Sequence, residues 1–424
     1  MLDDIRPPRP RRPQAAAKPK PQTITAPPEA DEVIDIDEAG LEAERPAAKQ
    51  RRLLVPPHKH FIRFWKWWLR LSRNERFAVI SVALLVFGAG SILWAAFIHP
   101  AATPSLTITR HPKPKPKSPL TIASPLTGVQ VDPNLAARPV TGIMIENSDQ
   151  ARPQSGLQDA GVVYEAIAEA GITRFLALFQ EGTPQYIGPV RSLRPYYIDF
   201  AAPFQASIAH VGGSPDALKI VRSGGFRDLD QFFNSGAYWR SSARYAPHNV
   251  YTSFERLDAL NKAKGYSISH FTSWLRKKDQ KLAAPTAKNI KLAISGPDYY
   301  ANYAYDPASN SYLRSEGGAP HMEFVSAADK TGVQLRPKVV IALVVPLGRG
   351  TLDASGAYYS DYQDSGSGQM YVFQDGGVTQ GTWVKASTNE QFQFTDANGV
   401  PIELDAGQTW ITLVSSASQV SYTP

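Results

Sequence analysis

The sequence predicts one membrane-spanning helix, then an α+β (mixed α/β) N-terminal ectodomain, then a mostly β C-terminal domain. Three observations lead to this prediction. A run of 22 residues without a formal charge covers residues 77–98. Glycine-punctuated strand patterns mix with helix patterns over residues 138–285. Only strand and hairpin patterns follow over residues 286–424.

The apolar run reads FAVISVALLVFGAGSILWAAFI from Phe77 to Ile98. About 20 apolar residues suffice for a helix to cross a hydrocarbon core of roughly 30 Å. Only Ser81 and Ser91 interrupt the run, so it lacks the polar stripe of a helix on a soluble domain. It also begins too far along the chain, and runs too long, for a cleaved signal. We therefore expect residues 77–98 to contact the lipid bilayer.

The basic, aromatic segment 59–76 predicts the orientation of this span. Six Lys and Arg residues lie between Lys59 and Arg76, whereas the first one after the span is Arg110. The positive-inside rule then puts the N-terminus in the cytoplasm and residues 138–424 outside it. The tryptophans of the segment suit the headgroup region, so the segment is expected to lie flat on the membrane.

The positive charge lies outside the expected folded region. The whole chain has a net charge of +7, but residues 138–424 hold 25 Lys and Arg against 26 Asp and Glu, a net of −1. A nucleic-acid-binding domain carries its own basic excess, so no nucleic-acid partner is expected. Residues 1–58 read as a disordered Pro-rich cytoplasmic tail, and residues 99–137 as a Pro/Lys linker. The chain has no cysteine, which excludes disulfides and thiolate chemistry.

The first folded region mixes strands with two helices. A proline opens the first helix, and the second has a hydroxyl near its start and a closing glycine. The expected strands are 138–147, 161–171, 172–180 and 206–214, and the expected helices are 215–223 and 252–265.

The second region reads as strands joined by tight turns. Asp306–Asn310, Asp375–Gly377 and Asn398-Gly399 supply the turn chemistry of three hairpins. The hairpins cover residues 302–316, 369–386 and 391–404, and single strands cover 291–296, 338–347 and 408–415.

Several of these stretches resemble a known family. They include RPVTGIMIENSDQARPQSGLQDAGVVYEAIAEAGITRFLALFQ, IGPVRSLRPYYIDF, AHVGGSPDAL, APHNVYTSFERL and GQMYVFQDGGVTQGTWVKAS. Over about Arg138–Ser415 the chain is similar to the YerB-like bacterial surface proteins, which have N- and C-terminal parts and no assigned function. The resemblance implies a membrane-anchored protein, often a lipoprotein. This chain has no cysteine for a lipid and departs from that pattern. The family implies no reaction.

Charged residues of the first region are the candidates for binding or catalysis. Arg191 and Arg194 stand three apart and could form a fork for a carboxylate or phosphate, or else brace a loop. If residues 162–170 form one strand, Glu165 and Glu169 share a face and could act as acid and base, although pairing of one with Arg174 is the commoner outcome.

A second polar set lies in two loops of the same region. His210 precedes two glycines, and His248 follows a proline; either could be a base. No metal-binding spacing of histidines is present and Ser214 lacks a nucleophile elbow, so we expect no metal, no cofactor and no serine nucleophile. The remaining candidates in these loops are Asp216, Arg244 and Asn249.

Three functions fit these patterns. The first is a cell-envelope binding module for an anionic ligand or a protein partner. The second is a hydrolase or transferase acting on the cell wall, using the Arg, His and Glu residues above. The third is a scaffold across the membrane, with the tail as a partner motif.

The aromatic residues of the second region could stack on sugars, but their alternation along strands favours packing. They are Tyr358, Tyr359, Tyr362, Tyr371, Trp383 and Trp410.

Overall fold

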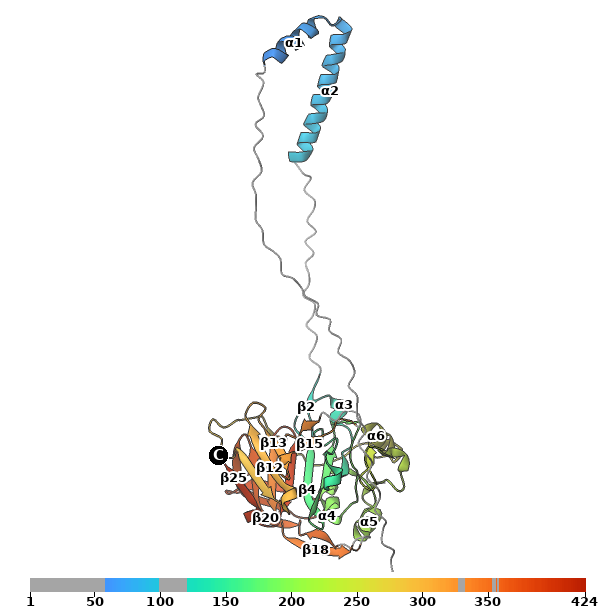
Figure 1. Cartoon of the computed structure of the whole chain (residues 1–424), viewed down its shortest axis with the longest axis vertical. Coiled ribbons are helices and arrows are strands. Elements are labelled where there is room, and N and C mark those ends of the chain that lie inside the picture. The colour runs from blue at the N-terminus through green and yellow to red at the C-terminus, as the bar shows by residue number, and fades with distance from the viewer. Residues whose placement is uncertain (1–57, 99–119, 327–331, 353–355, 357) are drawn as a thin grey trace, which may run out of the picture. The chain divides into compact units, whose positions relative to one another are not determined.

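A computed structural model of the chain describes residues 58–98, 120–326, 332–352, 356 and 358–424 (Figure 1). It divides into two compact units, residues 1–111 and residues 112–424. The tail expected at residues 1–58, apart from His58, and the first part of the linker expected at 99–137 lie outside the described residues.

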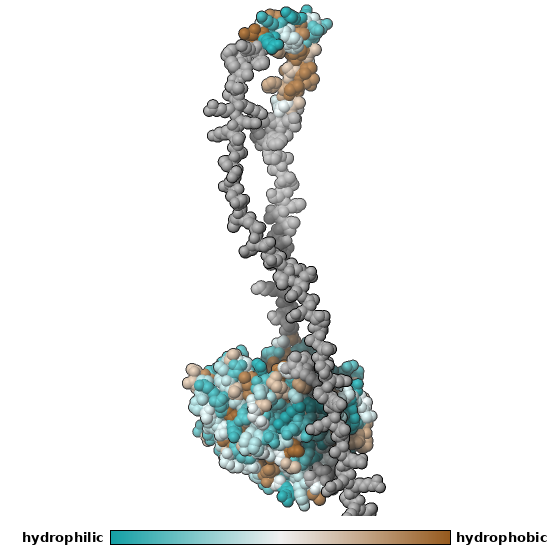
Figure 2. All heavy atoms as spheres, in the orientation of Figure 1, coloured by the Kyte–Doolittle hydropathy of each residue, from teal (hydrophilic) through white to brown (hydrophobic). Residues whose placement is uncertain are grey.

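Two helices form the described part of the first unit. They are α1 (His58–Leu69) and α2 (Arg73–Ile98). Ser72 and Glu75 cap the start of α2, because the Glu75 carboxylate accepts from the Ser72 N–H at 2.7 Å and the Ser72 hydroxyl accepts from the Glu75 N–H at 3.4 Å. Residues Arg73–Ser91 are long and apolar enough to cross a membrane and are not buried by protein. Figure 2 shows this helix as a mostly hydrophobic surface.

One large sheet organises the second unit. Its order is β22-β21-β20-β17-β24-β4-β5-β3-β6-β7, and β19 joins it beside β4 and carries β18. The strands are β3 (Thr141–Glu146), β4 (Val162–Glu169), β5 (Ile172–Phe179), β6 (Ser207–His210), β7 (Arg227–Asp230), β17 (Val339–Val344), β18 (Leu347–Leu352), β19 (Tyr358–Tyr362), β20 (Gly366–Gln374), β21 (Gly377–Lys385), β22 (Gln393–Asp396) and β24 (Thr409–Val414).

Strand β24 joins the two sequence regions. It runs parallel to β17 on one side and parallel to β4 on the other. All its residues are buried, as expected for a central strand with both faces covered. Strands from both sides of the boundary expected at residues 285/286 therefore belong to one sheet.

A second sheet of five strands has the order β14-β13-β12-β11-β25. Its strands are β11 (Asn289–Ala293), β12 (Tyr300–Asp306), β13 (Ser311–Glu316), β14 (Ala319–Pro320) and β25 (Val420–Thr423). Short strands form pairs elsewhere: β1 (Ile122–Ala123) with β2 (Gln130–Val131), β8 (Tyr238–Arg240) with β9 (Val250–Thr252), β10 (Arg276–Lys277) with β23 (Leu404–Asp405), and β15 (Met322–Glu323) with β16 (Val333–Gln334).

The helices of this unit are short. Ser214 caps α5 and Ser253 caps α6, each through its side-chain hydroxyl. The α-helices are α3 (Pro133–Ala136), α4 (Pro195–Ala201), α5 (Pro215–Arg222) and α6 (Phe254–Ala263). Single 3-10 turns are η1 (Asp149–Ala151), η2 (Ala202–Phe204), η3 (Ser235–Ala237), η4 (Pro297–Tyr299) and η5 (Ala417–Gln419).

Three apolar clusters fill the space between these layers. Residues of β3 alternate between two of them: Met144 packs with α4 and α5, whereas Ile143 and Ile145 pack with α6. The third cluster joins the five-stranded sheet to β17 and β20. Figure 1 shows the five-stranded sheet at one end of the unit, α5 and α6 at the other, and β4 between them.

The structure confirms the predicted mixture of few helices with strands and the mostly β region that follows. It differs from expectation in three places. Residues 120–137 belong to the folded unit, because Leu126 is buried in its core. The hairpin expected at 391–404 forms around Asn398-Gly399 but is shorter, because its pairing is confined to residues 394–402. After β24 the chain adds β25, which completes the five-stranded sheet.

Candidate functional site

Polar side chains gather where β3 and β4 end and β5 begins. Glu146 is the last residue of β3 and lies opposite Arg174 of β5, so both side chains point to the same face. The segment after Pro189 crosses this end: the Arg191 N–H donates to the Met144 carbonyl at 2.9 Å, and the Val211 N–H donates to the Arg191 carbonyl at 3.0 Å. The loop is thereby fixed to β3 and to the glycines after β6.

We call Glu146, Ser148, Arg191 and His248 the Glu146 cluster. The Glu146 Oε1 atom lies 2.9 Å from His248 Nδ1 and 3.4 Å from Arg191 Nε, and it accepts from the Ser148 hydroxyl at 3.0 Å. The carboxylate is buried, with 5% of its side chain exposed, but Arg191 is 28% exposed and His248 is 21% exposed. Arg191 and His248 thus each contact the same buried carboxylate and also reach the solvent.

Several polar atoms of the Glu146 cluster have no hydrogen-bond partner. In the described part of the chain, Glu146 Oε2 and Arg191 Nε are buried without a hydrogen bond. No hydrogen bond is found there for His248 Nε2 or for the terminal nitrogens of Arg191. Buried polar groups are normally satisfied, so the unused atoms leave capacity for a ligand or ordered water.

The Ser148 hydroxyl does not make this cluster a serine triad. In a triad, the serine and the carboxylate contact opposite nitrogens of the imidazole. Here Ser148 and Glu146 both face Nδ1, at 3.3 and 2.9 Å. The arrangement is instead a carboxylate–histidine pair whose other nitrogen, Nε2, can accept or donate a proton.

We call Glu169, Arg174 and Arg194 the Glu169 cluster. The Glu169 carboxylate accepts hydrogen bonds from Arg174 Nη2 at 2.6 Å and from Arg194 Nη2 at 2.8 Å. Both arginine side chains are almost fully buried. Arg174 also donates to the Ser192 carbonyl at 2.8 Å. Burial alone would raise the pKa of Glu169, but Arg174 and Arg194, with a smaller contribution from the more distant Arg191, outweigh it and hold that pKa below its usual range. This cluster is closed and braces the loop.

Glu165 lies in a separate buried network. Its carboxylate accepts a hydrogen bond from Arg314 Nη2 of β13 at 2.7 Å, and neither side chain is exposed. His321 accepts from Arg314 through Nδ1 and lies 2.8 Å from Gln154 Oε1 through Nε2. Burial, followed by the nearby arginines, lowers the pKa of His321 well below its usual value, so the ring is neutral. This network ties the five-stranded sheet to β4.

Glu165 and Glu169 therefore do not form the acid–base pair that a shared strand face would allow. The pairing of β4 with β5 shifts between Ile167 and Glu169. That irregularity turns Glu169 toward Arg174, while Glu165 points toward Arg314. Arg191 and Arg194 likewise do not form one fork, because Arg191 contacts Glu146 and Arg194 contacts Glu169.

The other candidates are engaged by structural partners. His210 is buried and uses both ring nitrogens, on the Gly212 carbonyl at 2.8 Å and on Asp228 at 3.1 Å. Arg244 donates to the carbonyls of residues 150, 152 and 153. Asn249 accepts from Arg240 at 2.7 Å. Asp216 accepts from two hydroxyl groups of the β18–β19 hairpin.

Sequence reasoning found Arg191 and His248 but missed Glu146 and Ser148. The strand GIMIE reads as core, and its final carboxylate follows an otherwise apolar run. A carboxylate in that position is the signal that could have found it. Of the six aromatic residues considered for stacking, all but Tyr358 are buried, as their alternation predicts.

The comparisons with known proteins match this architecture. Residues 126–267 match the N-terminal domain, and residues 290–411 the C-terminal domain, of a family described as "Protein of unknown function (DUF3048)". The protein is thus a two-part domain-of-unknown-function protein, and the resemblance seen in its sequence is confirmed. It belongs to the YerB-like family.

Two relatives support this assignment. The chain is 30% identical over 310 residues to the "Putative lipoprotein YerB" of Bacillus subtilis (strain 168), covering 71% of this chain and 88% of that protein. The crystal structure of YerB protein from Bacillus subtilis matches with a TM-score of 0.61 and 27% identity, covering 72% of this chain and all of that one.

Proposed function

We propose that this protein is a membrane-anchored, extracytoplasmic binding module of the bacterial cell envelope, with its ligand site at the Glu146 cluster. The observation that carries the proposal is the convergence of Arg191 and His248, both partly exposed, on one buried carboxylate. The other arginines proposed for binding, Arg174, Arg194 and Arg244, have protein partners.

The chemistry of the cluster favours an anionic group, a carboxylate or phosphate. Arg191 presents unused donors in a planar fork, and a protonated His248 adds another donor at Nε2. Glu146 keeps both side chains in place, and its own negative charge weakens binding of a simple anion. An anionic ligand is therefore expected to contact Arg191 and His248 Nε2 rather than the carboxylate.

A thermal-shift experiment on the full chain in detergent micelles tests this proposal. The panel contains inorganic phosphate and wall stem peptides with free carboxylates. A ligand at a hundred times its dissociation constant adds about 2.7 kcal/mol to the free energy of unfolding. We expect a shift in the wild type that Arg191→Ala and His248→Ala both abolish.

The control is Arg336→Ala, which removes an exposed arginine from the second region. It should bind as the wild type does. A shift that survives both Arg191→Ala and His248→Ala, or no shift with any anion, contradicts a binding site at the Glu146 cluster.

A second candidate function is a cell-wall hydrolase or transferase. The Glu146–His248 contact favours it, since a carboxylate that orients one imidazole nitrogen leaves the other available as a base. Turnover of a wall glycan or stem peptide that His248→Ala abolishes, while the variant stays folded, would favour this reaction over simple binding.

The proposed topology has α2 across the membrane, α1 on its cytoplasmic face and the second unit outside. Because the chain has no cysteine, single cysteines report on each side without background. Tyr245 is 92% exposed, so Tyr245→Cys in intact cells should react with a maleimide that cannot cross membranes. Ala16→Cys should react only after the cells are opened, and the reverse pattern would contradict this orientation.

A further inference from the structure

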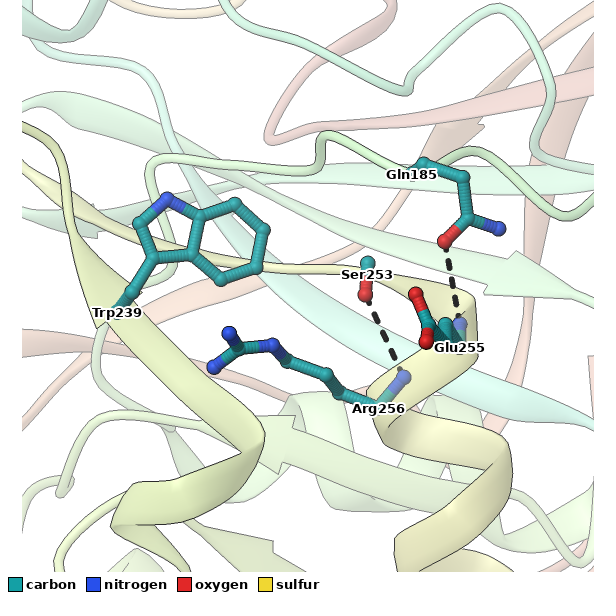
Figure 3. Close-up of a pocket in the computed structure, with 5 residues that line it drawn as sticks. All are labelled: Gln185, Trp239, Ser253, Glu255 and Arg256. Carbon is teal, nitrogen blue, oxygen red and sulfur yellow. Dashed lines mark hydrogen bonds between the residues drawn. The ribbon is translucent and has the colours of Figure 1, made fainter.

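A hollow lies beside α6, lined by residues that the Glu146 cluster does not use. It has a volume of about 600 Å³ and is lined by Gln185, Trp239, Ser253, Glu255 and Arg256. Figure 3 shows the Trp239 ring and the Arg256 guanidinium side by side, with Glu255 and Gln185 at the other end. Small-molecule sites usually occupy about 300–1,000 Å³, so the hollow has the size of a ligand site.

Its aromatic wall is held rigidly. Trp239 of β8 lies opposite Tyr251 of β9, and their rings stack with centroids 6.5 Å apart. Tyr251 in turn stacks on Tyr186 at 4.4 Å, with ring planes 9° apart. The Arg256 guanidinium carbon lies 4.9 Å from the centre of the Trp239 ring, and this guanidinium donates to two backbone carbonyls. The half-buried Trp239 is therefore fixed before any ligand arrives.

The polar rim offers donors and acceptors of opposite charge. Gln185 and Ser253 each accept a backbone N–H from the first turn of α6, so the helix start has few amides left for an anion. The Glu255 carboxylate has no ion-pair or hydrogen-bond partner among the described residues. Glu255 and Arg256 contribute one negative and one positive charge, which favours an uncharged ligand.

We propose that this hollow binds an uncharged sugar ring of a glycan chain. One face of a pyranose carries only C–H bonds and packs on an aromatic ring, while its rim carries hydroxyl groups that both donate and accept hydrogen bonds. Trp239 supplies the aromatic surface, Glu255 accepts, and Arg256 donates. The inference is independent of the Glu146 cluster, with which this site shares no residue.

A neighbouring hollow indicates that the ligand is a chain rather than a single sugar. It has a volume of about 550 Å³ and shares Glu255 and Arg256 with the first. Phe233, whose side chain is 72% exposed, adds a second aromatic surface there. Two adjoining hollows, each with an aromatic residue, provide places for successive rings of an oligosaccharide.

Calorimetric titration with three uncharged tetrasaccharides, tetra-N-acetylchitotetraose, cellotetraose and maltotetraose, tests the proposal. The full chain is kept in a polyoxyethylene detergent, since glycoside detergents would compete for the site. We expect at least one tetrasaccharide to bind, and Trp239→Ala to weaken that binding at least about tenfold, as truncation of an aromatic anchor does. Glu255→Gln, an exposed change that leaves the fold intact, should weaken binding of the same sugar by about fivefold.

The matched control is Tyr245→Ala, which removes an aromatic side chain that is 92% exposed and does not line the hollow. It should bind as the wild type does. No heat of binding for any of the three sugars up to about 10 mM overturns the proposal. Binding that is equal in wild type, Trp239→Ala and Glu255→Gln overturns this location. Arg191→Ala should leave sugar binding unchanged, so failure here does not bear on the anion site.

Discussion

Two carboxylates at the same end of the central sheet have opposite surroundings. Glu169 is held by two arginines whose side chains are 2% and 3% exposed. Glu146 is held by Arg191 and His248, which are 28% and 21% exposed. The first arrangement is complete within the protein, whereas the second leaves donors directed at solvent. The difference separates an ion pair that braces a loop from one that can receive a ligand.

A third carboxyl group, Asp364, shows what happens where no arginine is near. Asp364 is 5% exposed, and its Oδ2 atom has no hydrogen-bond partner in the described part of the chain. Burial, followed by repulsion from Asp199, raises the pKa of Asp364 to about 7. The pKa of Glu169 is thus lowered where arginines adjoin it, whereas that of Asp364 is raised because burial and Asp199 outweigh the nearby Lys385.

The largest effect is expected from Arg174→Ala, which removes one arginine from the Glu169 cluster. The free energy of unfolding should fall by about 3–5 kcal/mol, because Glu169 stays largely buried and keeps a direct ion pair with Arg194 alone. Unfolding in urea measures this change, because urea is uncharged and does not screen the ion pairs. The pKa of Glu169 is lowered in the folded protein, so its contribution is complete above the unfolded pKa and is lost as the pH falls through the folded value. In Arg174→Ala the folded pKa of Glu169 should rise, so this loss should be smaller and should end at a higher pH than in the wild type.

An intermediate effect is expected from Asp364→Asn, and it depends on pH. The folded pKa lies near 7 and the unfolded one near 3.9, so the folded protein keeps a proton that the unfolded chain has lost. Wild-type stability should therefore decrease by about 1.4 kcal/mol per pH unit between pH 5 and 7 from this group. The variant should lack this slope, and identical slopes would contradict the assignment.

The smallest effect on stability is expected from Arg191→Ala, the open counterpart of Arg174→Ala. Arg191 is partly exposed, and pairs of this kind contribute up to about 1 kcal/mol. The free energy of unfolding should change by less than that amount in urea. A loss comparable to that of Arg174→Ala would remove the contrast between the two clusters and mark Arg191 as a bracing residue.

Local structure was largely predictable from the sequence. Alternating apolar residues, turn glycines and hydroxyl caps predicted β3 to β6, α5, α6 and most hairpins, because these signals depend on neighbours in the chain. The site was predictable only in part. Arg191 and His248 stand out as polar residues in loops, whereas Glu146 ends a strand that reads as core.

Long-range pairing was not predictable. Glu165 meets Arg314 from 149 residues away, and Glu146 meets His248 from 102 residues away, so no local pattern reports either contact. The irregularity at the end of β4 also reverses the face expected for Glu169. Such a shift depends on the partner strand rather than on the sequence of β4 alone.

The central position of β24 constrains the order in which the chain can fold as it is made. The ribosome synthesises β4 roughly 250 residues before β24, which is its neighbour in the finished sheet. Until then the edge of β4 at residues 162–165, where β24 will pair, has no permanent partner and can pair with other chains. A nascent chain that stops short of residue 409 therefore lacks the strand that joins its halves. Completion of the large sheet therefore has to wait for the synthesis of β24.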